Sequence, residues 1–192
     1  MKKKTVIGIT GGLASGKTLV ADLFEKMGAH KIDADKISHE LLSDEGIKNE
    51  IVELLGNRIL SNGEIDRRKV SAIVFFDEKS LKGLCRILHP AILKRIKTET
   101  ERSAKEVVVV DAPLLFEEDL QEDVDQVIVV TATREKQIER AVRRGITEEE
   151  AVKIIKNQLS IEEKIRRADH VIDSDEDIES IKKGVVEIWQ KM

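Results

Sequence analysis

The stretch Val6-Ile7-Gly8-Ile9-Thr10-Gly11-Gly12-Leu13-Ala14-Ser15-Gly16-Lys17-Thr18 decides the fold of this chain. Its second part fits the pattern G-x-x-x-x-G-K-[ST] at every fixed position. An apolar, strand-like segment precedes the pattern, and apolar residues at helical spacing follow it, which is the context that a phosphate-binding loop requires. A glycine-rich turn with an incidental lysine is the alternative, and it would not need that context.

The chemistry of this loop follows from its residue types. Glycines let backbone N–H groups approach phosphate oxygens, and the helix that begins near Lys17 adds the positive end of its dipole. Lys17 is expected to neutralise the β- and γ-phosphates, and the Thr18 hydroxyl to bind Mg²⁺. We therefore predict that the chain binds ATP with Mg²⁺. The predicted ATP contacts are Gly11, Gly12, Leu13, Ala14, Ser15, Gly16, Lys17 and Thr18.

Composition limits the other classes of function. The chain has 192 residues, of which 41% are hydrophobic and 36% are charged, as expected for one globular domain with a charge-rich surface. Such a surface is found in heat-adapted proteins, but a mesophilic source fits equally well. The net charge of -4 argues against a nucleic-acid partner.

The location of the protein is predicted from what its sequence lacks. There is no apolar run long enough for a membrane span, and the N-terminus leads directly into strand-like sequence without a signal peptide. The single cysteine, Cys85, lies among apolar residues and is expected to be buried. We predict a cytoplasmic protein without membrane partners, and the sequence does not indicate protein partners.

Strand-like and helical segments alternate along the chain, which predicts a parallel sheet flanked by helices, the P-loop NTPase fold. Apolar Val107–Val110 has the composition of a strand that is covered on both faces. The other predicted strands are Thr5–Thr10, Lys31–Ile32, Val127–Val130 and His170–Ile172. We expect a single domain whose core comprises residues 1–34, 105–133 and 168–192.

Residues 35–104 show helical patterning and no convincing strand, so they predict a helical, substrate-binding insertion. Asn62-Gly63 predicts a tight turn, and Pro90 suits the first position of a helix. The predicted helices are Asp35–Leu42, Gly46–Leu55, Arg67–Phe76, Lys79–Leu88 and Pro90–Ser103.

Residues 134–167 form a second helical region, which is rich in basic residues and is expected to be a hairpin lid. Thr147 and Glu150 make a plausible capping box after a break at Gly145. Residues 176–190 predict a final helix that packs on the sheet.

Two acidic residues follow the second predicted strand. Ligands of open α/β sheets bind beyond the carboxyl ends of the strands, which brings Asp33 and Asp35 near the phosphate site. A carboxylate there can align an acceptor hydroxyl and take its proton. We favour Asp33 for this role, whereas Asp35 fits substrate binding and a helix cap equally well.

Asp111 ends the apolar strand in the manner of a Walker B acid. Such an acid contacts either the Mg²⁺ site or the substrate, and the sequence leaves both possibilities open. In the predicted lid, Arg140 shares a helix face with Arg143 and Arg144. A solvated basic face is the usual outcome, but beside a phosphate loop we favour Arg140 as a group that stabilises the transferring phosphoryl.

Together these motifs resemble the dephospho-CoA kinase family over nearly the whole chain. The resemblance rests on the phosphate loop, on Asp33-Ala34-Asp35 and on four further segments in the family's order and spacing. These are Leu88-His89-Pro90, Asp111-Ala112-Pro113-Leu114-Leu115-Phe116-Glu117, Gln137-Ile138-Glu139-Arg140 and Ala168-Asp169-His170-Val171-Ile172-Asp173.

The resemblance implies ATP-dependent phosphorylation of the ribose 3′-hydroxyl of dephospho-CoA. It implies that Asp33, Lys17 and Arg140 are catalytic, with Asp33 the base or orienting acid. It further implies a dephospho-CoA pocket lined by Asp35, His89, Asp111, Pro113, Leu114, Leu115 and Phe116. Another small-molecule kinase of the same fold, or a nucleotide-binding regulatory module, is the competing interpretation.

The chain departs from the family pattern at three places. Ser38-His39 stands where family members often carry Arg, and Ser43-Asp44-Glu45-Gly46 replaces a usual Pro-Gly. Asp173-Ser174-Asp175 replaces a common Asn and Gly near the adenine site. The adenine contacts are therefore less well defined than the phosphate site.

Overall fold

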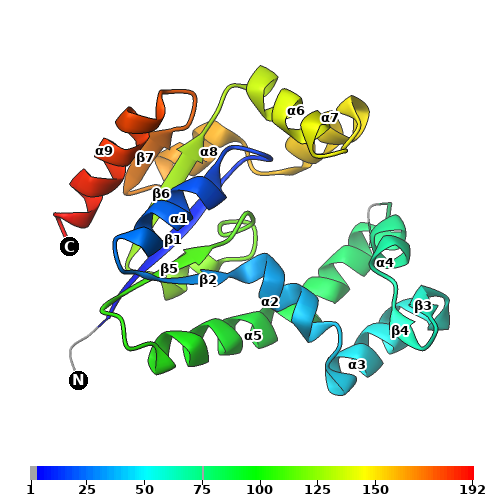
Figure 1. Ribbon diagram of the computed structural model, residues 1–192. Coiled ribbons are helices and arrows are strands. Elements are labelled where there is room, and N and C mark those ends of the chain that lie inside the picture. The colour runs from blue at the N-terminus through cyan, green and yellow to red at the C-terminus, as the bar shows by residue number, and fades with distance from the viewer. Residues whose placement is uncertain (1–3, 75) are drawn as a thin grey trace. The chain divides into compact units, whose positions relative to one another are not determined.

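The computed structural model describes residues 4–74 and 76–192, which form two compact units (Figure 1). One unit comprises residues up to Asp33 together with Glu99–Met192, and the other comprises Ala34–Thr98. The predicted lid, residues 134–167, belongs to the first unit. Movement of these residues as a lid stays a prediction.

A five-stranded parallel sheet forms the centre of the first unit, in the order β2-β5-β1-β6-β7. Its strands are β1 (Thr5–Gly11), β2 (His30–Asp33), β5 (Val107–Asp111), β6 (Gln126–Thr131) and β7 (His170–Asp173). The register places Asp111 opposite Asp33 on one side and opposite Ile9 on the other. The carboxyl ends of three adjacent strands therefore meet at one edge, and the predicted parallel sheet is confirmed.

Helices α1 (Lys17–Lys26) and α9 (Ile178–Trp189) pack together on one face of this sheet (Figure 1). Their apolar residues enclose Phe24, which is fully buried with its ring 6.3 Å from that of Trp189. Burying a side chain of this size contributes roughly 1.5–3 kcal/mol. Helix α8 (Ile161–Arg166) contacts β6. Val108 and Val110, which alternate with Val109 on β5, are also buried, as expected for a strand covered on both faces.

Two further helices of the first unit, α6 (Arg134–Arg143) and α7 (Glu148–Asn157), form the predicted hairpin. The chain turns between them at Gly145, whose φ is +84°. Thr147 and Glu150 form the predicted capping box, in which each side chain accepts a hydrogen bond from the other's backbone N–H. The 3₁₀ helix η2 (Leu120–Asp123) precedes β6.

The second unit is mainly helical, as predicted. It contains α2 (Ala34–Leu41), α3 (Glu45–Leu55), η1 (Asn57–Ile59), α4 (Arg67–Val74) and most of α5 (Glu78–Arg102). Ile51, Leu55, Ile59 and Val70 form its buried core. The helix predicted over residues 67–76 ends at Val74, and residue 75 lies outside the described residues. Cys85 is half-buried, so the prediction of a buried cysteine was wrong.

The prediction that Pro90 begins a helix was wrong. Pro90 lies inside α5, which runs without interruption from Glu78 to Arg102. Proline inside a helix removes one backbone hydrogen bond and favours a break. Here Leu84 and Leu88 before it pack on the core of the second unit, and Ile92 after it is buried. Burial on both sides of the proline outweighs its local preference.

The expectation that residues 35–104 contain no strand was also wrong. Two-residue strands β3 (Leu60–Ser61) and β4 (Glu64–Ile65) pair in an antiparallel hairpin around the predicted turn. Asn62 and Gly63 both have positive φ, 52° and 83°, as tight hairpin turns require. Strands this short show no alternation of polar and apolar residues, so sequence reasoning found the turn and missed the strands.

None of the helices in the described ranges is both long and apolar enough to cross a membrane.

Candidate active site

The phosphate loop connects β1 to α1, and steric contacts fix its glycines. A Cβ on Gly11 would lie 2.2 Å from the carbonyl oxygen of Val130 in β6, which no side chain can do. Gly16 precedes the helix with φ +92°, a left-handed conformation that favours glycine. Ala14 also has positive φ, 50°, and the Ser15 N–H donates to the Gly12 oxygen at 3.2 Å. The loop is thus held in a tight turn at the carboxyl end of β1.

Gly12 occupies a variable position of the motif, and a side chain at this position would meet the buried side chain of Gln137. A Cβ on Gly12 would lie 2.8 Å from the side-chain oxygen of Gln137 on α6. Gln137 is buried and donates from Nε2 to the Ala132 carbonyl. Its Oε1 has no hydrogen-bond partner in the described part of the chain. Sequence reasoning missed Gln137, although it stands in a segment quoted for the family resemblance.

The side chains that end the loop contact Asp111 and the loop itself. The Thr18 hydroxyl donates to Asp111 Oδ2 at 3.3 Å, and Lys17 Nζ lies 3.4 Å from the Gly12 carbonyl oxygen. Asp111 Oδ1 is buried, and within residues 4–74 and 76–192 it has no hydrogen-bond partner. The structure therefore brings Lys17, Thr18 and Asp111 together, as the sequence predicted.

Burial raises the pKa of the Asp111 carboxyl above its ordinary value. The positive charge of Lys17 opposes that rise, and the negative charge of Asp33 adds to it. Ionisation of Asp111 is thus less favourable than that of an exposed carboxyl, and a nearby cation would stabilise the ionised form.

Asp33 is exposed at the end of β2, as the register partner of buried Asp111. Helix α2 begins at the next residue, Ala34, so Asp33 occupies the N-cap position. Asp35 lies inside the first turn of α2, and its interpretation as the helix cap was wrong. A carboxylate in that turn still stabilises the helix dipole.

Arg140 on α6 joins the phosphate loop to the loop after β7. Its NH1 donates to Ser174 Oγ at 2.8 Å and to the Ala14 carbonyl at 3.4 Å. Its NH2 donates to the Ser174 carbonyl at 2.9 Å and lies 3.4 Å from Asp175 Oδ1. Ser174 also packs on Gly16, where a Cβ would lie 3.1 Å from the Ser174 Cβ. The segment that departs from the family pattern thus holds this arginine against the phosphate loop.

The charge of Asp175 is stabilised where it meets Arg140. Although burial would raise the pKa of Asp175, the Thr133 N–H bond and the charges of Lys136 and Arg140 lower it. Asp175 therefore remains ionised at neutral pH and keeps the guanidinium oriented.

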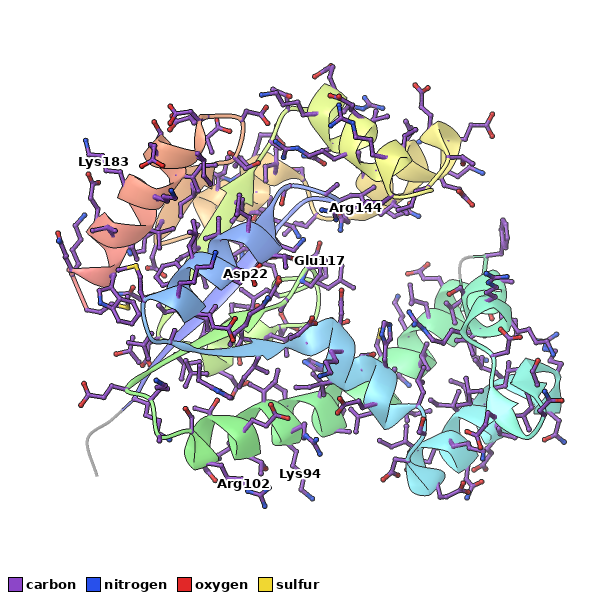
Figure 2. All side chains as sticks on the ribbon, viewed as in Figure 1. Asp22, Lys94, Arg102, Glu117, Arg144 and Lys183 are labelled. Carbon is purple, nitrogen blue, oxygen red and sulfur yellow. The ribbon has the colours of Figure 1, made fainter. Side chains whose placement is uncertain are left out.

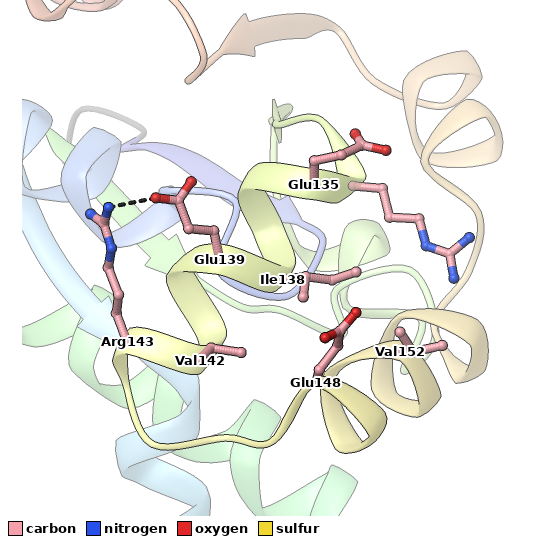
Figure 3. Close-up of a pocket in the computed structure, with 8 residues that line it drawn as sticks. Glu135, Ile138, Glu139, Val142, Arg143, Glu148 and Val152 are labelled. Carbon is pink, nitrogen blue, oxygen red and sulfur yellow. Dashed lines mark hydrogen bonds and ion pairs between the residues drawn. The ribbon is translucent and has the colours of Figure 1, made fainter.

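The basic residues of the predicted lid divide into inward and outward groups. The side chain of Arg140 is 29% exposed, whereas that of Arg143 is 74% exposed and pairs with Glu139 on the same helix (Figure 3). Arg144 is exposed as well. Arg143 and Arg144 belong to a solvated face, and Arg140 alone of these three contacts the phosphate loop.

A groove of about 660 Å³ lies between α6 and α7 (Figure 3), away from this chemistry. Its lining residues are Arg134, Glu135, Ile138, Glu139, Val142, Arg143, Glu148 and Val152. No predicted site residue lines it, and the groove is not the phosphate site.

The tip of the phosphate loop packs against the helical hairpin. Ala14 lies in one apolar cluster with buried Ala141 of α6 and Ala151 of α7, and Leu13 packs against the same cluster. Because these side chains are small, the hairpin approaches the loop backbone closely.

The loop after β5 contains four predicted substrate contacts, and two of them face the core. Leu115 is fully buried, with its methyl groups about 3 Å from a Cβ built on Gly8 of β1. Phe116 is buried beneath the Arg167 guanidinium, which lies 4.4 Å from the ring centre. Both side chains are buried in this structure, and their role in lining a substrate pocket stays a prediction. Leu114 is exposed and Pro113 is half-buried.

Asp35 and His89 belong to the second unit, and their role in substrate binding stays a prediction. His89 lies on α5, and its Nε2 is buried without a hydrogen-bond partner among the described residues. A buried nitrogen without a partner is uncommon and suits a residue that awaits a polar ligand.

Comparison with known proteins assigns the family. The model of the dephospho-CoA kinase family matches residues 5–180. This chain belongs to the dephospho-CoA kinase family. A dephospho-CoA kinase from Fusobacterium nucleatum is 40% identical over 182 residues, covering 94% of each chain. One from Bacillus cereus is 42% identical over 176 residues, 88% of each, and one from Aquifex aeolicus is 38% identical over 189 residues, 97% and 96% of the chains.

Solved structures agree with the family and the fold. The dephospho-CoA kinase of Campylobacter jejuni has a TM-score of 0.69 at 27% identity, covering 98% of this chain and 96% of its own. A Thermus thermophilus crystal structure superposes with a TM-score of 0.89 at 28% identity, covering 100% and 99%. A shikimate kinase from Acinetobacter baumannii, 17% identical with a TM-score of 0.55, covers 99% and 93% and shares the fold. The protein is a P-loop kinase, and the predicted fold class is confirmed.

Proposed function

We propose that this protein transfers the γ-phosphoryl group of ATP to the ribose 3′-hydroxyl of dephospho-CoA, producing coenzyme A and ADP. One observation carries the proposal beyond membership of the family. An exposed carboxylate, Asp33, ends the strand next to Asp111, whose partner Thr18 begins the helix of the phosphate loop. A phosphate-binding loop beside an exposed carboxylate suits transfer of a phosphoryl group to the hydroxyl of an acceptor.

On the donor side, Gly11–Thr18 binds the triphosphate. Backbone N–H groups and the N-terminal end of α1 face its oxygens, and Lys17 neutralises the β- and γ-phosphates. Arg140, held by Ser174 and Asp175, adds a planar guanidinium at the same loop. These groups stabilise negative charge where it develops in transfer.

The residues present fit Mg²⁺. Thr18 and Asp111 supply oxygen ligands or hold ligand waters, and the unpartnered Asp111 Oδ1 is an acceptor of the type that this ion prefers. When bound, the ion neutralises phosphate charge.

On the acceptor side, Asp33 orients the ribose 3′-hydroxyl and takes its proton. The hydroxyl oxygen forms a bond to the γ-phosphorus, and the bond from that phosphorus to the β–γ bridging oxygen breaks with its electrons leaving on ADP. Asp35, His89, Pro113 and Leu114 are the proposed contacts to the rest of dephospho-CoA.

The direct test is turnover of purified protein with ATP, Mg²⁺ and a panel of acceptors. Dephospho-CoA should give ADP and a product phosphorylated at the 3′ position, whereas nucleosides, nucleotides and shikimate should give no more ADP than water alone. Turnover of a nucleoside with none of dephospho-CoA would replace this proposal with the competing kinase assignment. ADP release at one rate whatever the acceptor would indicate a hydrolytic regulatory module.

A further inference from the structure

The residues that join α7 to α8 hold two loops at once. Gln158 Oε1 accepts a hydrogen bond from the Leu13 N–H of the phosphate loop at 2.9 Å. The next residue, Leu159, donates its N–H to Glu117 Oε1 at 3.0 Å. Glu117 is the last residue of the Pro113–Glu117 loop after β5, and it is labelled in Figure 2. Two consecutive residues thus connect the donor loop with the loop that follows Asp111.

Lys164 on α8 contacts both ends of the Pro113–Glu117 loop. Its side chain has no exposed surface, and Nζ lies 2.9 Å from Glu117 Oε1. Nζ also donates to the Pro113 carbonyl at 3.1 Å, and the Thr10 hydroxyl of β1 donates to that same carbonyl at 3.0 Å. One buried ammonium therefore holds both ends of the loop.

Stability alone is a weak reason for such a lysine. Burying an ion pair costs desolvation that its attraction only partly returns, and well-packed apolar residues of similar volume are often as stable. What an ammonium adds is direction, because it fixes the positions of two oxygens. Here these oxygens belong to Pro113 and Glu117, at opposite ends of a loop whose second residue, Leu114, is exposed.

We propose that Gln158 and Lys164 are positioning residues that fix the phosphate loop and the Pro113–Glu117 loop relative to each other. Binding of the triphosphate to the phosphate loop then restrains the Pro113–Glu117 loop. Leu13 moves with the triphosphate, Gln158 follows Leu13, and Leu159 with Lys164 transmits the restraint to Glu117. The identity of the acceptor rests on the proposed function, but the coupling between the two loops does not.

The coupling is measured without turnover, by hydrogen exchange with a non-hydrolysable ATP analogue and Mg²⁺. In the unaltered protein the analogue should slow exchange in residues 11–18 and also in residues 113–119. Two variants should lose this coupling: the single variant Gln158→Leu and the double variant Lys164→Met with Glu117→Gln. In each of them the analogue should slow hydrogen exchange in residues 11–18 but not in residues 113–119. The double variant leaves no unpaired buried charge, and Lys156→Met, an exposed site on α7, is the matched control and should behave as the unaltered protein.

Exchange in residues 113–119 that is unaffected by the analogue in the unaltered protein, or equally slowed in both variants, would overturn the proposal. Exchange coupling in a protein that does not turn over dephospho-CoA would overturn the proposed function and leave this inference standing.

Kinetics separates positioning from general stability. In the double variant, KM for dephospho-CoA should rise on the order of 10- to 100-fold while KM for ATP stays within about twofold, since misplacement of a binding loop by about 1 Å can have effects of this size. The single variant Lys164→Arg, which keeps the positive charge beside Glu117, should show a smaller rise in KM for dephospho-CoA than the double variant. Equal increases in both KM values, with no recovery by arginine, would indicate a structural role only.

Discussion

Asp33 and Asp111 are register partners at the carboxyl ends of adjacent parallel strands, but one is exposed and the other is buried. Neighbouring strands lie about 4.8 Å apart, so two carboxylates of different surroundings end the strands beside the phosphate loop. The exposed carboxylate, Asp33, is the group that we propose takes the proton of the acceptor hydroxyl. The buried one contacts Thr18 and suits a cation.

Replacing Asp33 with Asn should lower kcat by about 10²–10⁴-fold, since an amide cannot take the proton of the acceptor hydroxyl. ATP affinity, measured by titration calorimetry, should be unchanged. Asp35→Asn is the matched control, because it removes a carboxylate two residues away, and it should alter KM for dephospho-CoA more than kcat. Near-normal kcat in Asp33→Asn would remove Asp33 from its role.

Replacing Asp111 with Asn should raise the melting temperature of the ligand-free protein at neutral pH. Burial raises the pKa of this carboxyl in the folded state, so folding is disfavoured once pH exceeds the raised value. The neutral amide avoids that cost and still accepts the Thr18 hydrogen bond.

The stabilisation by Asp111→Asn should shrink as pH falls through the raised value, and vanish below the ordinary carboxyl pKa of about 3.9, where both states bind the proton. Thermal melts between pH 3 and 8 test this sign. A variant whose advantage grows toward low pH would contradict the assignment. The rise in melting temperature on addition of ATP with Mg²⁺ should be smaller for the variant than for the unaltered protein.

Replacing Arg140 with Lys should lower kcat by about tenfold or more, because a lysine cannot reproduce a planar fork that bonds Ser174 and Asp175 together. Arg143→Lys makes the same chemical change at an exposed site on the same helix and should have little effect. Equal kinetics in the two variants would exclude a specific guanidinium role.

Gly12→Ala should destabilise the protein by about 1–3 kcal/mol, since its Cβ would meet the Gln137 amide at 2.8 Å. Adding Gln137→Ala should recover much of this loss, which urea titration of the single and double variants measures. Gly11→Ala should lose more stability, and Gln137→Ala should not rescue it, because the contact there is with the Val130 backbone. Equal rescue at both positions would contradict these contacts.

Much of this protein could be predicted from local patterns. The phosphate loop, the parallel strands, the final helix and the capping box at Thr147 each depend on residues close in sequence, and the structure contains them all. The error at Pro90 arose because packing in the second unit outweighed the local preference of proline. The β3–β4 hairpin was missed because two-residue strands are too short to show an alternating pattern.

By itself the sequence determined that a triphosphate-binding loop begins an α/β kinase, because the residues that turn the backbone around phosphate are consecutive. Only the tertiary structure decided which polar groups support that loop. Arg140 and Ala14 are 126 residues apart, and Gln158 and Leu13 are 145 apart. The composition of the basic segment 134–167 does not reveal which of its arginines and lysines face solvent and which face the site. The packing of α6, α7 and α8 on the sheet unit turned Arg140 and Lys164 inward and left Arg143 in water, and no local pattern carries that distinction.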